Sequence, residues 1–100
     1  MFLKDVVIEE NREIKPGNYL MSFRDKEIAG ESKIGQFLEI KAGNGIENLL
    51  RKPISINDVE NDKVTIIYRV IGKGTTKLSE YKPGDKISVL GPLGNSFPEI

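Results

Sequence analysis

The residue types available for chemistry are restricted in this chain, because its 100 residues include no Cys and no His. Thiolate nucleophiles, disulfides, iron–sulfur ligation and Cys-based zinc sites are therefore excluded within it. Acid–base or nucleophilic work would fall to carboxylates, Lys, Tyr or hydroxyl groups, or to a bound cofactor that brings its own reactivity. We therefore expect no catalytic side chain and favour cofactor binding.

Three short clusters combine cations, hydroxyl groups, aromatic rings and glycines. They are Leu49 to Ser55, Tyr68 to Thr76 and Gly91 to Phe97. In the middle cluster, Gly72-x-Gly74 lacks the third glycine and the long helix of a dinucleotide-binding loop, and Gly72-Lys73-Gly74-Thr75 departs from the Walker phosphate loop. A glycine-flanked strand end before a short helix still presents N–H groups beside the hydroxyls of Thr75 and Thr76, which suits a pyrophosphate. Taken alone, these residues are better explained by glycines that end a strand and a Thr that caps the next turn.

The clusters carry more weight together, because they could line one continuous groove. It would contain cations at the start of one strand, a hydroxyl within that strand, an aromatic ring and a cation on the partner strand, and the glycine–threonine turn. Such a groove fits a flavin dinucleotide, with an apolar strip for the ring, a cation for ring oxygens or phosphate, and N–H groups for pyrophosphate. The candidate cofactor-binding residues are Arg51, Lys52, Pro53, Ile54, Ser55, Tyr68, Arg69, Val70, Gly74, Thr75 and Thr76.

Short strands are predicted to position these residues. Ile and Val outnumber Ala and Leu, and 10 Gly and 5 Pro supply frequent turns. Alternating apolar and polar residues predict six strands: Phe2 to Glu9, Asn18 to Arg24, Gln36 to Lys41, Pro53 to Asn57, Lys63 to Ile71 and Lys86 to Leu90. One short helix is expected from Thr75 or Thr76 through Tyr81, whereas residues 25 to 34 are charged and show no period. The predicted fold is all-β, a six-stranded antiparallel Greek-key barrel with one short helix.

Turn residues separate the expected strands. Lys15-Pro16-Gly17-Asn18 joins the first two, and the short acidic segment Asp58 to Asp62 makes the fourth and fifth an antiparallel pair. A Gly43-Asn44-Gly45 loop precedes the fourth strand, and Gly91-Pro92-Leu93-Gly94 is predicted to form a turn after the sixth.

Composition excludes some classes of function. The 15 Lys and Arg balance the 15 Asp and Glu, and basic residues alternate with acidic ones instead of clustering as nucleic-acid binding requires. No apolar run approaches membrane-spanning length, and Met1 to Asp5 lacks the character of a signal peptide. We therefore expect a single cytoplasmic domain over residues 1–100, with no nucleic-acid or membrane partner.

The same residues resemble a known family. Three segments carry the resemblance: Leu49-Leu50-Arg51-Lys52-Pro53-Ile54-Ser55-Ile56, Ile66-Ile67-Tyr68-Arg69-Val70 with the Gly-x-Gly-Thr after it, and Leu90 to Asn95. They are similar to the electron-transfer subunit of the NAD-linked (type B) dihydroorotate dehydrogenase. The similarity extends from Gly35 to Phe97 with the same spacing. This family belongs to the ferredoxin-reductase superfamily. Its members consist of an N-terminal FAD-binding barrel, a nicotinamide-binding domain and a C-terminal Cys cluster that holds a two-iron two-sulfur centre.

The resemblance implies a role in pyrimidine biosynthesis as part of an oxidoreductase. Electrons from dihydroorotate would pass from FMN in a catalytic partner subunit, through the iron–sulfur cluster, to FAD in this barrel and on to NAD. The nicotinamide-binding and iron–sulfur domains are then absent from this chain, which would be catalytically incomplete alone. Its surface around Leu93, Asn95 and Phe97 would contact the absent nicotinamide-binding domain.

One position departs from the superfamily's flavin motif, Arg-x-x-Ser. Three residues before Ser55 stands Lys52, and Arg51 precedes it. Lys52 offers a point charge in place of a forked guanidinium, whereas Arg51 starts from the opposite face of a strand. The flavin-contacting cation is therefore either of the two.

Two other functions compete with this one. The chain could be the FAD domain of a related reductase, such as a sulfide dehydrogenase or a ferredoxin-dependent transhydrogenase. It could also be a cofactor-free barrel that binds a protein partner, against which stands the concentration of Arg51 to Ser55 and Tyr68 to Thr76 in one groove. Visible absorption after mixing with FAD would discriminate between a flavin module and such a barrel.

Overall fold

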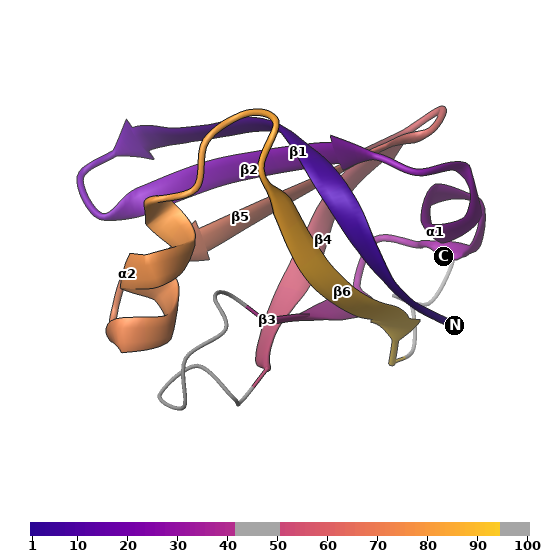
Figure 1. The fold of residues 1–100 in the computed structure, drawn as a ribbon. Coiled ribbons are helices and arrows are strands. Elements are labelled where there is room, and N and C mark those ends of the chain that lie inside the picture. The colour runs from indigo at the N-terminus through magenta and orange to yellow at the C-terminus, as the bar shows by residue number, and fades with distance from the viewer. Residues whose placement is uncertain (42–50, 95–100) are drawn as a thin grey trace.

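Six strands form a closed antiparallel barrel in the order β1-β2-β5-β4-β3-β6, in a computed structural model that describes residues 1–41 and 51–94 (Figure 1). The predicted fold class is therefore confirmed. The strands are β1 (Phe2–Lys15), β2 (Asn18–Arg24), β3 (Phe37–Lys41), β4 (Lys52–Glu60), β5 (Lys63–Arg69) and β6 (Lys86–Leu93). Two short helices, α1 (Lys26–Glu31) and α2 (Lys73–Ser79), lie on opposite sides of the barrel.

The first strand joins the two halves of the barrel. Its beginning pairs with β6, from Phe2 opposite Gly91 to Val7 opposite Lys86, and from Ile8 onward it pairs with β2. A register shift between Ile8 and Glu10 marks the change of partner, as expected where a bulge bends a strand. The predicted strand stopped at Glu9 because the residues that follow are mostly polar, and the structure places most of them on the exposed outer surface.

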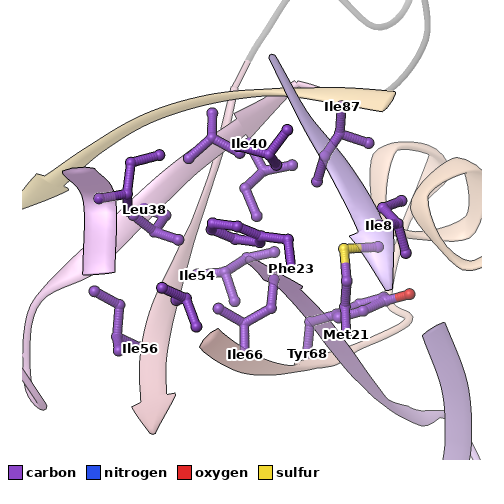
Figure 2. Packing of buried hydrophobic residues seen from close by; sticks show 14 of the residues in the cluster. Ile8, Met21, Phe23, Leu38, Ile40, Ile54, Ile56, Ile66, Tyr68 and Ile87 are labelled. Carbon is purple, nitrogen blue, oxygen red and sulfur yellow. The ribbon is translucent and has the colours of Figure 1, made fainter. Parts of the chain in front are cut away.

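Inward-facing side chains fill the barrel. Along β4, Ile54 and Ile56 are buried, while Pro53 before them and Ser55 between them are exposed, as the two-residue period of a strand requires. Phe23 is fully buried, and Figure 2 shows aliphatic side chains from several strands around its ring. Tyr68 lies at the edge of this cluster, with its hydroxyl directed away from Phe23.

The helices differ from the predicted one in extent and number. The expected helix is α2, which begins at Lys73 rather than at Thr75 or Thr76 and ends at Ser79. The further helix α1 lies in residues 25 to 34, where no period was found. It begins after the Asp25 carboxylate, which accepts a hydrogen bond from the Ile28 N–H at 2.9 Å. Six residues make fewer than two turns, too few for a helical period to show.

The turns follow the sequence signals in part. The turn at Pro16 and Gly17 is confirmed between β1 and β2. The ladder of β4 and β5 extends beyond Asp58 to Glu60, opposite Lys63, which leaves Asn61 and Asp62 as the turn. The predicted Gly43-Asn44-Gly45 loop lies outside the described residues.

The predicted turn at Gly91 to Gly94 is wrong in its first three residues. Strand β6 continues to Leu93, which is half-buried opposite Phe37 of β3. The strand continues through Gly91 because this residue has no side chain, which lets β3 approach closely. A Cβ atom at Gly91 would lie 2.7 Å from Leu38 Cδ2 and 3.3 Å from the Phe37 carbonyl oxygen. Leu93 therefore has a partner strand, while Asn95 and Phe97 of the predicted interface lie outside the described residues.

This close approach predicts that Gly91→Ala lowers the free energy of unfolding by about 1–3 kcal/mol, the usual cost of overpacking. Gly30→Ala is the matched control, because a Cβ at that helical position meets no atom within 4 Å. Urea denaturation of both variants measures the effect. Equal stability of the two would contradict the close approach of β6 and β3.

Candidate functional site

A groove lies where β4, β5 and the segment that leads into α2 come together. Its volume is about 420 Å³ and its lining is mostly apolar. It is lined by Lys52, Pro53, Ile54, Ser55, Ile67, Tyr68, Arg69, Ile71, Gly72 and Thr75. The structure thus brings together most of the residues that the sequence singled out.

The groove exists because two neighbouring strands part. The ladder between β4 and β5 runs from Glu60 opposite Lys63 to Ile56 opposite Ile66, and the described pairing stops there. Beyond that point β4 pairs with β3, and β5 remains paired with β2. The stretches Pro53 to Ser55 and Ile67 to Arg69 therefore face each other across an opening, which exposes one edge of the barrel interior to the groove.

Tyr68 contributes a fixed aromatic surface to the groove. The residue is 4% exposed, and its ring stacks on Tyr19 with the centroids 5.6 Å apart and the planes at 23°. Its hydroxyl donates a hydrogen bond to Asn11 Oδ1 at 2.7 Å. Burial raises the pKa of the Tyr68 hydroxyl well above its usual range, so the side chain remains a neutral phenol.

Adjacent cations lie on different sides of the barrel wall. Lys52 lines the groove, and its side chain crosses the start of α2 so closely that a Cβ on Gly74 would lie 2.7 Å from Lys52 Cε. Arg51 instead donates to Ser88 Oγ at 2.8 Å and to the carbonyl oxygens of Glu39 and Ser88 at 3.3 Å. It lines a separate polar hollow with Ser88 and Lys86. Of the two, only Lys52 lines the groove.

The Thr75 hydroxyl is occupied within the chain. It accepts hydrogen bonds from the Ile71 N–H at 2.9 Å and the Gly72 N–H at 3.2 Å, and it donates to the Gly72 carbonyl at 3.2 Å. The residue is also 9% exposed. Thr75 therefore holds the turn that enters α2, in agreement with the capping Thr that the sequence offered as the alternative to a phosphate-binding hydroxyl.

Three other candidates lie beside the groove rather than in its lining. The Val70 N–H donates to the Gly17 carbonyl at 2.9 Å, and the Val70 side chain packs against the core. Gly74 contacts Lys52, as described above. Thr76 is exposed on α2, where its N–H donates to the Gly72 carbonyl at 2.9 Å.

The lining also includes Ile67, Ile71 and Gly72, which were not among the candidates. Ile71 is 80% exposed and Ile67 is 38% exposed, which is unusual for large aliphatic side chains. Ile67 could have been found from the alternation along β5, because it shares the outer face with Arg69. Nothing in the local pattern distinguishes Ile71, which is placed by the path of the chain between β5 and α2.

Within residues 1–41 and 51–94, no group of three or more acidic residues is placed to hold a metal ion. No helix within these ranges is long and apolar enough to cross a membrane.

Similar sequences are found among proteins of one kind, although no protein-family model matches the chain. The dihydroorotate dehydrogenase B (NAD(+)) electron transfer subunit of Fusobacterium nucleatum is 38% identical over an alignment of 99 residues that covers 97% of this chain and 38% of that protein. The subunit of the same name from Desulforamulus reducens is 42% identical over an alignment of 86 residues that covers 84% of this chain and 33% of that protein. The chain therefore spans about a third of the length of these relatives.

Similar structures agree on the fold. The structure of an NADH-dependent reduced ferredoxin-NADP oxidoreductase, described for flavin-based electron bifurcation, matches with a TM-score of 0.83 and 27% identity over 93% of this chain and 34% of that one. The cytochrome b5 reductase domain of Ulva prolifera nitrate reductase matches with a TM-score of 0.74 and 18% identity over 93% and 42%. The second match shows the fold alone.

The closed barrel, its groove and these matches define a ferredoxin-reductase-like domain of the oxidoreductases. Within that class, nearly the whole chain is homologous to one portion of the electron transfer subunit of dihydroorotate dehydrogenase B.

The opposite placement of the two cations predicts different effects of replacing them. Arg51→Ala removes the donors to Ser88 and Glu39, and we expect the free energy of unfolding to fall by about 1–2 kcal/mol. Lys52→Ala should change it by less than about 0.5 kcal/mol, as for most exposed positions. Urea denaturation measures both. A larger loss for Lys52→Ala than for Arg51→Ala would contradict the assignment.

Proposed function

We propose that the chain is the FAD-binding module of a dihydroorotate dehydrogenase B electron transfer subunit. Its groove would hold the FAD of an electron-transfer chain. In that chain, dihydroorotate is oxidised at the FMN of a catalytic partner subunit, and the electrons pass through an iron–sulfur cluster to FAD and then to NAD. The observation that carries the proposal is the groove between the parted ends of β4 and β5, in a chain homologous to these subunits.

The residues in the groove fit a flavin in size and polarity. A volume of about 420 Å³ lies within the usual range for ligand sites, which are mostly apolar with a few polar groups. Ile54 and Tyr68 line the groove, and the more exposed Ile67 and Ile71 side chains add apolar surface for contact with an aromatic ring system. The Lys52, Ser55 and Arg69 side chains form no ion pair or hydrogen bond with other described residues, so they remain available to a ligand.

Charge and hydrogen-bonding capacity assign separate tasks to these side chains. The Lys52 ammonium and the Arg69 guanidinium suit the phosphate groups or the ring oxygens of a flavin nucleotide, and the forked guanidinium of Arg69 can bind two oxygens at once. The exposed Ser55 hydroxyl can donate to a ring nitrogen or oxygen. Thr75 would act through the shape of the turn that it holds, because its own hydroxyl is occupied.

No side chain of this chain needs to act as an acid, a base or a nucleophile in this role. FAD supplies the redox chemistry when bound, and the protein supplies binding, orientation and the local electrostatic field. This division of work agrees with a chain that contains neither Cys nor His. It also agrees with a Tyr68 hydroxyl whose pKa is raised and which is hydrogen-bonded to Asn11.

A second candidate is the flavin domain of a related reductase. The similarity to the reduced ferredoxin-NADP oxidoreductase, at a TM-score of 0.83, favours it. Against it, sequence identity is 38–42% with the dihydroorotate dehydrogenase subunits and 27% with that reductase. A cofactor-free barrel is disfavoured, because the Lys52, Ser55 and Arg69 side chains, which form no ion pair or hydrogen bond with other described residues, all line one mostly apolar groove.

Titration of the chain with FAD tests the proposal, with flavin fluorescence and visible absorption as readouts. We expect Ser55→Ala to raise the dissociation constant roughly two- to tenfold, equivalent to one hydrogen bond, and Lys52→Met to raise it at least as much. Lys26→Met is the matched control, since Lys26 is an exposed lysine at the start of α1, on the other side of the barrel. Unchanged affinity in both groove variants, with normal unfolding, would overturn this placement of the flavin.

Thr75→Ala is expected to behave differently from Ser55→Ala. It leaves the Ile71 and Gly72 N–H groups without their acceptor, so it should lower both the unfolding temperature and the affinity for FAD. Thr75→Ser retains the hydroxyl and should restore most of both. Weakened FAD binding with unchanged unfolding would indicate that the hydroxyl acts on the ligand directly.

A further inference from the structure

Asn11, in the second half of β1, links the groove to the far end of α2. Its Nδ2 donates to the carbonyl oxygens of Leu78 at 2.9 Å and Tyr81 at 2.8 Å. Its Oδ1 accepts the hydrogen bond from the Tyr68 hydroxyl at 2.7 Å. Both donors of the amide and one acceptor are thus engaged, and this pattern is possible in only one orientation of the amide group.

These three bonds join parts of the chain that form two walls of the groove. Tyr68 belongs to β5 and lines the groove directly. Leu78 and Tyr81 lie in and just beyond the last turn of α2, and the beginning of the same structure, at Gly72 and Thr75, lines the groove on another side. Figure 1 shows α2 beneath the hairpin of β1 and β2, which is where β1 carries Asn11.

Among the described residues, α2 has few buried side chains of its own to hold it in place. The helix has seven residues and buries the Leu78 and Thr75 side chains. Leu78 packs into the core at 1% exposure, but an apolar contact fixes an orientation less sharply than directed hydrogen bonds do. The amide of Asn11 is planar and short, so it sets the position of α2 relative to Tyr68.

The same amide holds the hydroxyl end of the Tyr68 side chain. The hydroxyl oxygen lies on the axis about which the ring turns, so this bond fixes the end of the side chain, while stacking of one ring face on Tyr19 sets the plane of the ring. Without Asn11, a buried phenol hydroxyl would lack its partner, which is costly in a protein interior.

We propose that Asn11 is a positioning residue for the flavin groove: through its amide it sets the separation of α2 from β5 and holds the hydroxyl end of the Tyr68 side chain in place. This inference rests on the proposed function. Asn11 itself is not part of the groove lining, so it would act through Tyr68 and α2 and not by touching the flavin.

Two variants separate the contributions of the three hydrogen bonds of Asn11. Asn11→Asp keeps the size and the acceptor for Tyr68 but loses both donors, and it places a carboxylate against two carbonyl oxygens. Tyr68→Phe keeps the link to α2 and removes only the hydroxyl. Val64→Ala is the control, because it opens a cavity in the core at the opposite end of β5 and lowers stability without touching the groove.

The readouts are the FAD dissociation constant, the visible circular dichroism of bound FAD, and amide hydrogen exchange at Thr76, Glu80 and Tyr81, whose N–H groups donate to backbone carbonyls in and just beyond α2. We expect Asn11→Asp to raise the dissociation constant about tenfold, comparable to the loss of one or two hydrogen bonds, and to speed exchange at these amides. Tyr68→Phe should alter the circular dichroism with a smaller change in affinity and no faster exchange. Val64→Ala should lower stability and leave all three readouts near those of the unaltered chain.

Failure of the inference is separable from failure of the proposed function. If the unaltered chain binds FAD and Asn11→Asp binds it equally well, with the same circular dichroism, the positioning role is overturned and the function stands. If the unaltered chain binds no FAD, the function is overturned, and the exchange measurement alone decides whether Asn11 fixes α2. Unchanged exchange in Asn11→Asp would then overturn the inference as well.

Discussion

The parting of β4 and β5 beyond Ile56 and Ile66 is the feature on which the rest of the site depends. A closed barrel normally buries its interior and pairs every strand edge. Here β4 continues alongside β3 and β5 continues alongside β2, so each strand keeps one partner while the pair between them opens. The opening brings Ile54 and Tyr68, which belong to the core, to the surface of a groove. Apolar contact for a ligand therefore comes from the same residues that stabilise the barrel.

The polar side chains at this opening are divided between those that the fold uses and those that would remain for the proposed ligand. Arg51 donates to Ser88 and Glu39 and thereby ties β6 and β3 together at the start of β4, whereas Lys52 extends into the groove across Gly74. The Thr75 hydroxyl likewise serves the turn before α2 and leaves Ser55 as the exposed hydroxyl. A binding site needs groups that the fold does not use, and here adjacent residues meet the two needs separately.

Through helix α2, the shape of the groove depends on a strand that does not line it. Its first turn lies at the groove, and its last turn is held by Asn11 from β1, a strand that takes no direct part in the lining. Tyr68 is held by Asn11 on one side and by Tyr19 of β2 on the other. The geometry offered to a flavin would thus be set by residues that never touch it, a common arrangement in sites that must be rigid.

The sequence by itself determined the fold class and the approximate strands, because strand alternation and turn chemistry are local properties. It also determined most residues of the groove, because Lys52 to Ser55 and Tyr68 to Arg69 stand on neighbouring strands. Only the tertiary structure placed Lys52 and not Arg51 in the lining of the groove, occupied the Thr75 hydroxyl, extended β6 to Leu93 and linked Asn11 to Tyr68. Asn11 and Tyr68 are 57 residues apart in the chain, and no local pattern relates them. Such contacts exist only after the strands have closed, because barrel closure brings distant polar groups together where burial obliges each to find a partner.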